Sequence, residues 1–468
     1  MAGNGNNGTN DKPPPSYTGI KTIFIANILE AFYRIYQGIP DKERNYWTLY
    51  DTLDGNRALL YNGDNKIIIS PQPIFPGHKE HLCALLGWKN VHNLSPRLSS
   101  PSICEDIVRP GKFGDIVEDI VRANPGVGLI PYRATKEFYR LTSFFSRKGL
   151  KFTLPETVPE DSEFISMYCN SKRGFRHFWN RALGSNTTIP IDIPDGFIVG
   201  DKEEAIEAAW WFQQKRKSFV IKLNRGTQGI GIAFFKSSQL PHTEKAFQEE
   251  VKAKLNDKLW DQPAIVVEEM IAQDLSVLNG SPSVEFFINS EGQVAPTYGG
   301  EQIFAEDRKT FSGFYIHPEA TYHPYIQTAF RAGVQFGEEL ADIGYHGYFD
   351  IDLVCGKDNQ LYAVESNLRR TGGTHIHDLA VSLLGKNYMG THHVLGEDIH
   401  LPEDKRTSYD KCFKIFKPVL YNKATESGFI FGNPDMLQVN ILHGIFIGPT
   451  RKKMEEVRRR VNRLIASL

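Results

Sequence analysis

The sequence predicts an α/β protein in which an N-terminal layer of alternating strands and helices precedes a larger region of antiparallel strands. In the first 150 residues, short apolar runs alternate with amphipathic stretches. After Lys151 several apolar runs are joined by short glycine-rich or polar turns, which is typical of hairpins. With 468 residues, of which 41% are hydrophobic, the chain is long enough for about three domains with substantial cores.

Residues 1–18 are rich in Gly, Asn and Pro and are predicted to form a disordered tail. Residues 19–150 are predicted to form an α/β domain that starts with a strand at Ile20–Ala26 and a helix through Tyr36. Further strands are expected at Ala58–Tyr61, Lys66–Ser70 and Gly128–Pro131, and helices at Lys79–Trp88 and Phe113–Ala123.

Residues 151–400 form the second predicted domain and residues 401–468 a small α+β segment. Asp201 and Glu204 are spaced as a capping box, which predicts a helix over Asp201–Lys215. The tail from Cys412 is predicted to form strands and turns, and Lys452–Ala466 a final helix. Strands of the second domain are predicted at Phe219–Leu223, Ile232–Phe235, Ala264–Glu268, Ser283–Ile288, Tyr348–Val354 and Leu361–Glu365.

The overall composition excludes several classes of protein. Lys plus Arg number 54 and Asp plus Glu 55, so the net charge of −1 offers no chain-wide field for nucleic acid or anionic lipid. Five scattered cysteines argue against a disulfide framework or a zinc ribbon. No apolar run approaches the roughly 18 residues of a membrane helix, and the N-terminus does not resemble a signal peptide. We therefore expect a cytoplasmic protein that binds neither membranes nor nucleic acid.

The first motif with chemical meaning is the glycine-rich turn of Lys222-Leu-Asn-Arg-Gly-Thr-Gln-Gly-Ile-Gly. A lysine leaves a strand, and Gly226, Gly229 and Gly231 precede the returning strand. Glycines let backbone N–H groups approach phosphate oxygens, although the same residues also suit a plain hairpin turn. No Lys-Ser or Lys-Thr pair closes the loop, so it is not a Walker A motif.

The second motif is Ile265-Val-Val-Glu-Glu-Met-Ile, an apolar strand that ends in two adjacent acids. Backbone groups at such a strand end can pair with the edge of a purine. Two solvated glutamates at the end of a core strand would give the same pattern.

The third motif is the most specific of the three. Asp352 lies within one predicted strand, and Glu365 and Asn367 close the next, where spacing i, i+2 directs both side chains to the same face. Such hard oxygen ligands suit Mg²⁺ at nucleotide phosphates, and Arg369 would share their side. Acids inside apolar strands are costly without partners, so a purely structural hairpin is the less favoured interpretation.

The order and spacing of these motifs resemble the ATP-grasp ligases over about residues 165 to 395. The resemblance also includes the lysine of Ser171-Lys172-Arg-Gly-Phe-Arg. It implies a Rossmann-like pre-ATP-grasp domain, an ATP-grasp fold whose antiparallel sheets clamp ATP, and a small C-terminal α+β extension.

The same resemblance implies roles for individual residues, with ATP as co-substrate and Mg²⁺ or Mn²⁺ as cofactor. Arg369 and Arg370 would be catalytic, and Asp352, Glu365 and Asn367 would bind the metal. ATP would be bound by Lys172, Lys222, Gly226, Gln228, Gly229, Gly231, Glu268, Glu269, Met270, Ile271 and, at the ribose, Asp274 or Glu285.

Two further segments, Gly300–Pro318 and Arg369–His375, resemble the pheganomycin-type peptide ligases. This resemblance implies that a carboxylate, of an amino acid or peptide, is activated as an acyl phosphate and condensed with an amine, with release of ADP. The loop Asp307–Tyr315 would close over that intermediate, and the turn Thr371–His375 would contact a substrate.

Alternatives are a kinase, an ATP-dependent ligase that acts on another substrate, and a nucleotide-binding module without turnover. His375, His377, His392, His393 and His400 raise the question of zinc, but their spacing favours ordinary polar contacts. The N-terminal domain is available for substrate contacts or for a homodimer interface.

Overall fold

The computed structural model describes residues 17–61, 63–159, 163–184, 188–305 and 310–468. The predicted tail 1–18 therefore lies almost wholly outside the described residues, as does part of the predicted loop Asp307–Tyr315. In the described part the strands form three sheets of five, four and nine strands. No described helix is both long and apolar enough to cross a lipid bilayer.

The N-terminal sheet is wholly parallel, with the strand order β3-β2-β1-β4-β5. The first strand lies in the middle, because the chain is wound outward on both sides of it, as in a Rossmann-like unit. The strands are β1 (Thr22–Ile25), β2 (Lys66–Ile69), β3 (Val91–Leu94), β4 (Val127–Pro131) and β5 (Phe152–Thr153). The helices are α1 (Ile28–Tyr36), α2 (Asp41–Asp54), α3 (Pro76–Leu86), α4 (Ile103–Val108), α5 (Lys112–Ala123) and α6 (Lys136–Arg147).

This domain differs from the prediction in several features, and the prediction did not include β3 or β5. The run Ala58–Tyr61 is not a strand, because residues Gly55–Leu60 form a 3₁₀-helix, η1, that continues directly from α2. A short, wholly buried apolar run has no period that distinguishes a strand from a helical turn. The sequence prediction also missed α2, whose first half is polar and largely exposed, although its last five residues are buried.

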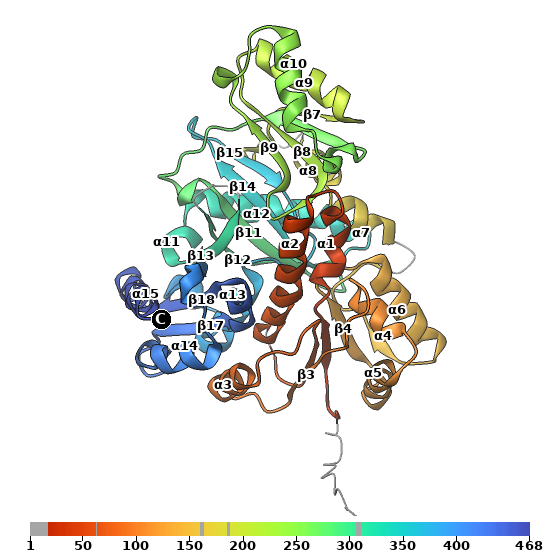
Figure 1. Cartoon of the computed structure of the whole chain (residues 1–468), viewed down its shortest axis with the longest axis vertical. Coiled ribbons are helices and arrows are strands. Elements are labelled where there is room, and N and C mark those ends of the chain that lie inside the picture. Colours follow the sequence, from red (N-terminus) through yellow and green to blue (C-terminus); the bar gives the residue numbers. More distant parts are fainter. Residues whose placement is uncertain (1–16, 62, 160–162, 185–187, 306–309) are drawn as a thin grey trace, which may run out of the picture.

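The four-stranded sheet is antiparallel, with the order β7-β10-β8-β9. Its strands are β7 (Gly196–Val199), β8 (Phe219–Thr227), β9 (Ile230–Phe235) and β10 (Ile265–Glu269). Helices α9 (Lys202–Gln214) and α10 (Glu244–Lys254) pack beside it, at the top of Figure 1. The predicted cap of α9 is confirmed, because the Asp201 side chain accepts a hydrogen bond from the Glu204 N–H at 2.9 Å.

The nine-stranded sheet has the order β17-β18-β16-β13-β12-β11-β14-β15-β6. Its strands are β6 (Ile191–Asp192), β11 (Pro282–Ile288), β12 (Val294–Phe304), β13 (Phe311–Ile316), β14 (Gly347–Cys355), β15 (Leu361–Glu365), β16 (His393–His400), β17 (Gly428–Asn433) and β18 (Ile441–Gly448). The remaining helices are α7 (Glu163–Cys169), α8 (Lys172–Leu183), α11 (Pro318–Thr321), α12 (Pro324–Asp342), α13 (Thr374–Leu384), α14 (Tyr409–Phe416) and α15 (Arg451–Ala466).

The C-terminal segment completes this large sheet. Strand β18 pairs with β16 along its whole length, and α15 packs on β18. The final helix is confirmed, but Cys412 lies in α14, so the start of the predicted strand-and-turn tail is helical. Helix α2 lies near the centre of the molecule, and β17 and β18 lie in the lobe at the lower left together with α14 and α15 (Figure 1).

Candidate functional site

A cavity of about 320 Å³ lies between the four-stranded sheet and the nine-stranded sheet. One side of it is formed by β8, β9 and β10, and the other by β14 and β15. Helix α2 of the N-terminal domain lines one end, which we call the α2 end. The predicted site residues that line it are Lys172, Lys222, Gly226, Gln228, Gly229, Glu268, Glu269, Met270, Ile271, Asp352, Glu365, Asn367 and Arg369. Residues separated by almost 200 positions are thus brought to one site.

Two buried lysines enter the cavity from different elements. Lys172 is the first residue of α8, whose Ser171 cap accepts a hydrogen bond from the Gly174 N–H at 3.1 Å, and its Nζ lies 3.0 Å from Oε1 of Glu365. Lys222 projects from β8 and forms an ion pair with Glu268. Both lysines are more than nine-tenths buried, so their charges act in a medium of low polarity.

The glycine-rich turn is a hairpin between β8 and β9, as the sequence predicted. Gln228 and Gly229 both have positive φ angles, of 50° and 77°, which shape the tip of the turn. At Gly226 a Cβ atom would lie 2.6 Å from the Ile230 carbonyl oxygen and 4.0 Å from Lys172 Nζ. Glycine at this position therefore lets the hairpin backbone lie close to the lysine.

The end of β10 forms a short stretch of the cavity lining, Glu268–Ile271. The Glu268 carboxylate is buried and also pairs with Arg176, whose Nη1 lies 3.1 Å from Oε2. Glu269 pairs instead with Lys217 at 2.5 Å, and the Met270 N–H donates to the Ser218 carbonyl at 2.9 Å. The two adjacent glutamates are therefore engaged with protein partners, unlike the solvated pair that the sequence left open.

The acidic motif assembles on two neighbouring strands. Asp352 of β14 lies directly opposite Glu365 of β15, and the Asn367 Nδ2 lies 3.4 Å from Oδ2 of Asp352. Burial and the nearby Glu365 raise the pKa of Asp352 to about 6. Burial would also raise the pKa of Glu365, but Lys172 and Lys222 outweigh it and lower that pKa below its ordinary value.

A further acid, Asp350, was missed by the sequence analysis. Its Oδ1 accepts hydrogen bonds from the Asn367 backbone N–H at 2.8 Å and from Asn367 Nδ2 at 3.1 Å. Burial, reinforced by the charge of Asp352, raises its pKa well above the ordinary value. Spacing i, i+2 from Asp352 was the available signal, because it places both side chains on one face of β14.

This group of donors fits a hard divalent cation. Carboxylate and amide oxygens of Asp352, Glu365 and Asn367 are the ligands that Mg²⁺ prefers, and they gather beside two lysines suited to phosphate. The mutual repulsion that raises the pKa of Asp352 would be relieved by a bound cation.

The two predicted catalytic arginines have different environments. Arg369 lines the cavity, where its Nη2 donates to Asn367 Oδ1 at 2.9 Å. Arg370 lies outside the cavity and pairs with Glu156 at 2.7 Å and with Asp378 at 3.0 Å. Arg370 therefore does not line the cavity where a catalytic position was expected. Its buried ion pairs instead join the strand end to the segment before α7 and to α13.

The two predicted ribose acids also lie outside the cavity. Asp274 is half-buried and accepts hydrogen bonds from the backbone N–H and side chain of Ser276, which lower its pKa. Glu285 is fully buried, which raises its pKa to about 7, and it accepts hydrogen bonds from Tyr298, Thr371 and Thr374. Because Thr371 lines the cavity, Glu285 supports the cavity lining from behind. Gly231 likewise lies beneath the hairpin, against Leu223.

A second acidic group at the α2 end of the cavity was not foreseen. Asp51, Asp54 and Arg57 line it together with Asp398 of β16 and His443 of β18. These residues come from the two ends of the chain, and no local sequence pattern links them.

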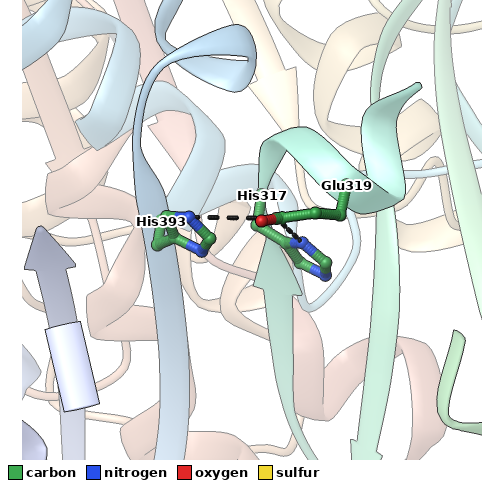
Figure 2. Close-up of side chains that lie close together, drawn as sticks. All are labelled: His317, Glu319 and His393. Carbon is green, nitrogen blue, oxygen red and sulfur yellow. Dashed lines mark hydrogen bonds and ion pairs between the residues drawn. The ribbon is translucent and has the colours of Figure 1, made fainter. Parts of the chain in front are cut away.

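Three side chains capable of metal binding, His317, Glu319 and His393, meet where β13 ends and β16 begins (Figure 2). Glu319 Oε2 lies 2.8 Å from His317 Nδ1 and 3.8 Å from His393 Nε2, and His317 Nε2 lies 3.0 Å from Glu301. None of the three lines the cavity. Of the other histidines that raised the question of zinc, His375 contacts His443 and His377 contacts Tyr388.

Comparison with solved structures identifies the fold. The chain superposes on biotin carboxylase from Campylobacter jejuni with a TM-score of 0.54 and 12% identity, over 92% of this chain and 87% of that one. N5-carboxyaminoimidazole synthase from Aspergillus clavatus was solved in complex with ADP and 5-aminoimidazole ribonucleotide. It matches with a TM-score of 0.54 and 9% identity, over 96% of this chain and 99% of that one. The expected ATP-grasp architecture is thus confirmed, because this chain shares the fold of these two proteins.

Sequence comparison is more limited. No family model matches the chain. A stretch of 128 residues is 30% identical to the L-propargylglycine–L-glutamate ligase of Streptantibioticus cattleyicolor. It covers 27% of this chain and only 24% of that relative.

Proposed function

We propose that this protein is an ATP-dependent carboxylate–amine ligase that forms ADP and uses Mg²⁺ or Mn²⁺. The observation that carries the proposal is a single cavity lined by Lys172, Lys222, the glycine hairpin and the group Asp352, Glu365 and Asn367. A degenerate binding module would not be expected to keep this full set.

We further propose that the carboxylate belongs to an amino acid or a peptide. The similarity to a ligase named for two amino acids favours this class, although it extends over a quarter of that relative. The segments that resemble peptide ligases favour the same class, and eleven of their residues, among them Phe311, Thr371 and His375, line the cavity.

The chemistry would proceed in two steps. A carboxylate oxygen attacks the γ-phosphorus of ATP, the bond from that phosphorus to the bridging oxygen breaks, and ADP leaves with the electron pair. The amine nitrogen then attacks the acyl carbon, and the carbon–oxygen bond to phosphate breaks. Phosphate leaves with that electron pair, and the proton lost by nitrogen passes to phosphate or water.

The protein's main contribution would be to position the reactants and neutralise charge. Asp352, Glu365 and Asn367 would hold the divalent cation, which would neutralise phosphate charge. Lys172, Lys222 and Arg369 would offset the remaining negative charge and then stabilise the oxyanion formed when the amine attacks.

The test is ADP release with Mg-ATP and pooled L-amino acids, with mass spectrometry of the products. Glu365→Gln should lower ADP release by about a hundredfold or more, because it removes a ligand charge at the reacting phosphate. The same substitution at Glu291, in the exposed turn after β11, is the matched control and should leave the rate unchanged. Full activity of Glu365→Gln would contradict the metal assignment, and a phosphorylated product without an amide would identify a kinase.

A further inference from the structure

The α2 end of the cavity carries three acids close together. Asp51, Asp54 and Asp398 line it with the guanidinium of Arg57 and with His443, and Arg369 lines the same cavity. From these contacts, and resting on the proposed function, we infer that Asp51, Asp54 and Asp398 form the subsite that binds the ammonium group of the amine acceptor.

Each of the three carboxylates is held in place by a partner. Asp51 Oδ2 accepts a hydrogen bond from the Tyr36 hydroxyl at 2.6 Å, and Asp54 Oδ2 lies 2.9 Å from Arg57 Nη1. Asp398 accepts a hydrogen bond from the Tyr50 hydroxyl at 3.2 Å and lies 2.5 Å from His443 Nδ1. The subsite is therefore built from α1, α2, η1, β16 and β18, and its geometry is fixed by these elements.

The cations of the chain do not balance this group. Burial raises the pKa of Asp51 to about 7 and the nearby Asp54 adds to the rise, although the Tyr36 hydrogen bond, Arg57 and Arg369 act against it. Burial also raises the pKa of Asp54, with Arg57 acting against it and Asp398 adding to it. A bound ammonium would supply the missing positive charge, whereas a phosphate or carboxylate would be repelled.

Two polar atoms of the cavity lining, by contrast, lack hydrogen-bond partners. Among the described residues, Nε of Arg57 and Nδ1 of His375 are buried without a hydrogen bond. Arg57 is 8% exposed, His375 is fully buried, and both line the cavity beside the acids. Buried donors and acceptors of this kind are normally satisfied, so their presence indicates that a polar ligand belongs at this end.

Arg369 connects this subsite with the centre of phosphoryl transfer. Its Nη2 contacts Asn367 at 2.9 Å, and its charge lowers the pKa values of Asp51, Asp54 and Asp352 alike. An acceptor nitrogen held by the α2 acids would therefore lie in the same cavity as the metal ligands, with Arg369 close to both groups. From there it could approach an acyl group activated beside Asp352 and Glu365.

Hydroxylamine allows activation of the carboxylate to be measured independently of binding of the amine acceptor. It is largely uncharged at neutral pH and traps an acyl phosphate as a hydroxamate without needing an ammonium subsite. We would compare hydroxamate formation with amide formation in wild type and in Asp51→Asn, supplying Mg-ATP and pooled L-amino acids. Asp41→Asn, at the exposed start of the same helix, is the matched control.

The expected result is that Asp51→Asn forms hydroxamate at nearly the wild-type rate. Its kcat/KM for the amine should fall by about tenfold or more, as expected for loss of one charge-assisted contact. Asp41→Asn should match wild type in both assays. Asp398→Asn provides the same comparison from a different strand, should Asp51→Asn lower the melting temperature.

Three outcomes would overturn the inference while leaving the ligase intact. The first is an unchanged kcat/KM for the amine in folded Asp51→Asn. The second is a parallel loss of hydroxamate and amide formation in that variant. The third is that the wild-type protein forms hydroxamate but uses none of the amino acids as the amine. The absence of both ADP and hydroxamate in wild type would instead remove the proposed function, and the inference with it.

Discussion

Arg369 and Arg370 are neighbours in sequence with different environments, because one lines the cavity and the other is buried in a network with Glu156 and Asp378. Arg369→Gln should lower ADP formation and leave the melting temperature unchanged. Arg370→Gln should lower the free energy of unfolding by about 3–5 kcal/mol, because it leaves two buried carboxylates without their partner.

Denaturant unfolding and the ADP assay, applied to both variants, check this contrast. A stable Arg370→Gln variant with wild-type unfolding but no activity would show that the buried network is misassigned.

Where a strand fixes the direction of its side chains, the sequence was sufficient to predict which residues share a face. Glu365 and Asn367 face the cavity together because they are two residues apart, and Asp352 joins them from the adjacent strand. The chain leaves the strand after Glu365, so alternation no longer specified where Arg370 would point. Asp274 and Glu285 do not line the cavity, and neither spacing nor residue type reports whether an acid reaches a cavity or a neighbouring hydroxyl group.

Among the elements, β2 contains an unusual buried cation, Lys66, whose Nζ donates to the Leu59 carbonyl at 2.9 Å and lies 3.8 Å from the Trp88 ring centroid. Burial lowers its pKa from 10.5 to about 7. Between these two values the unfolded chain binds a proton that the folded chain does not. Stability should therefore rise with pH from about 7 to 10.5, by a contribution that approaches about 1.4 kcal/mol per pH unit.

Urea unfolding of wild type and Lys66→Met across this pH range measures the contribution. The difference in slope between them isolates Lys66 from other groups that titrate there. Identical slopes would mean that the lysine stays charged in the folded protein.

Most elements were predictable, because their apolar periods and caps are local. The cap of α9 and the pairing of β14 with β15 are examples. Helix α2 could not be predicted, because its first half is exposed and mostly polar and therefore has no clear apolar stripe. Missing α2 also concealed Asp51 and Asp54, and with them one end of the cavity.

The whole molecule depends on its last residues, because β17 and β18 extend the same sheet that carries β14 and β15. Removal of residues 401–468 would leave β16 as an open edge and would take away His443 from the cavity. We expect the truncated chain to aggregate, as measured by light scattering after purification. A monodisperse truncated protein with the wild-type melting temperature would show that residues 401–468 form an independent unit.

Sheet membership could not be predicted from the sequence at this scale. Which sheet a strand joins is decided by packing between distant segments, and the local patterns of β16 and β18 contain no information about each other. Residues from the N-terminal and the C-terminal parts of the chain together line the α2 end of the cavity. The sequence therefore indicated only the chemistry of the part lined by the lysines and the acidic motif.

The ion pairs of the two cavity lysines have a consequence for how ligands would bind. Glu365 holds Lys172 and Glu268 holds Lys222, so a phosphate must compete with a carboxylate for each lysine. A divalent cation on Glu365 would at the same time weaken its attraction for Lys172 and leave that lysine available to the phosphate. Nucleotide and cation would therefore assist each other's binding, and by linkage the assistance is equal in both directions. Such reciprocal cooperativity would favour the complete metal–nucleotide complex over either component alone.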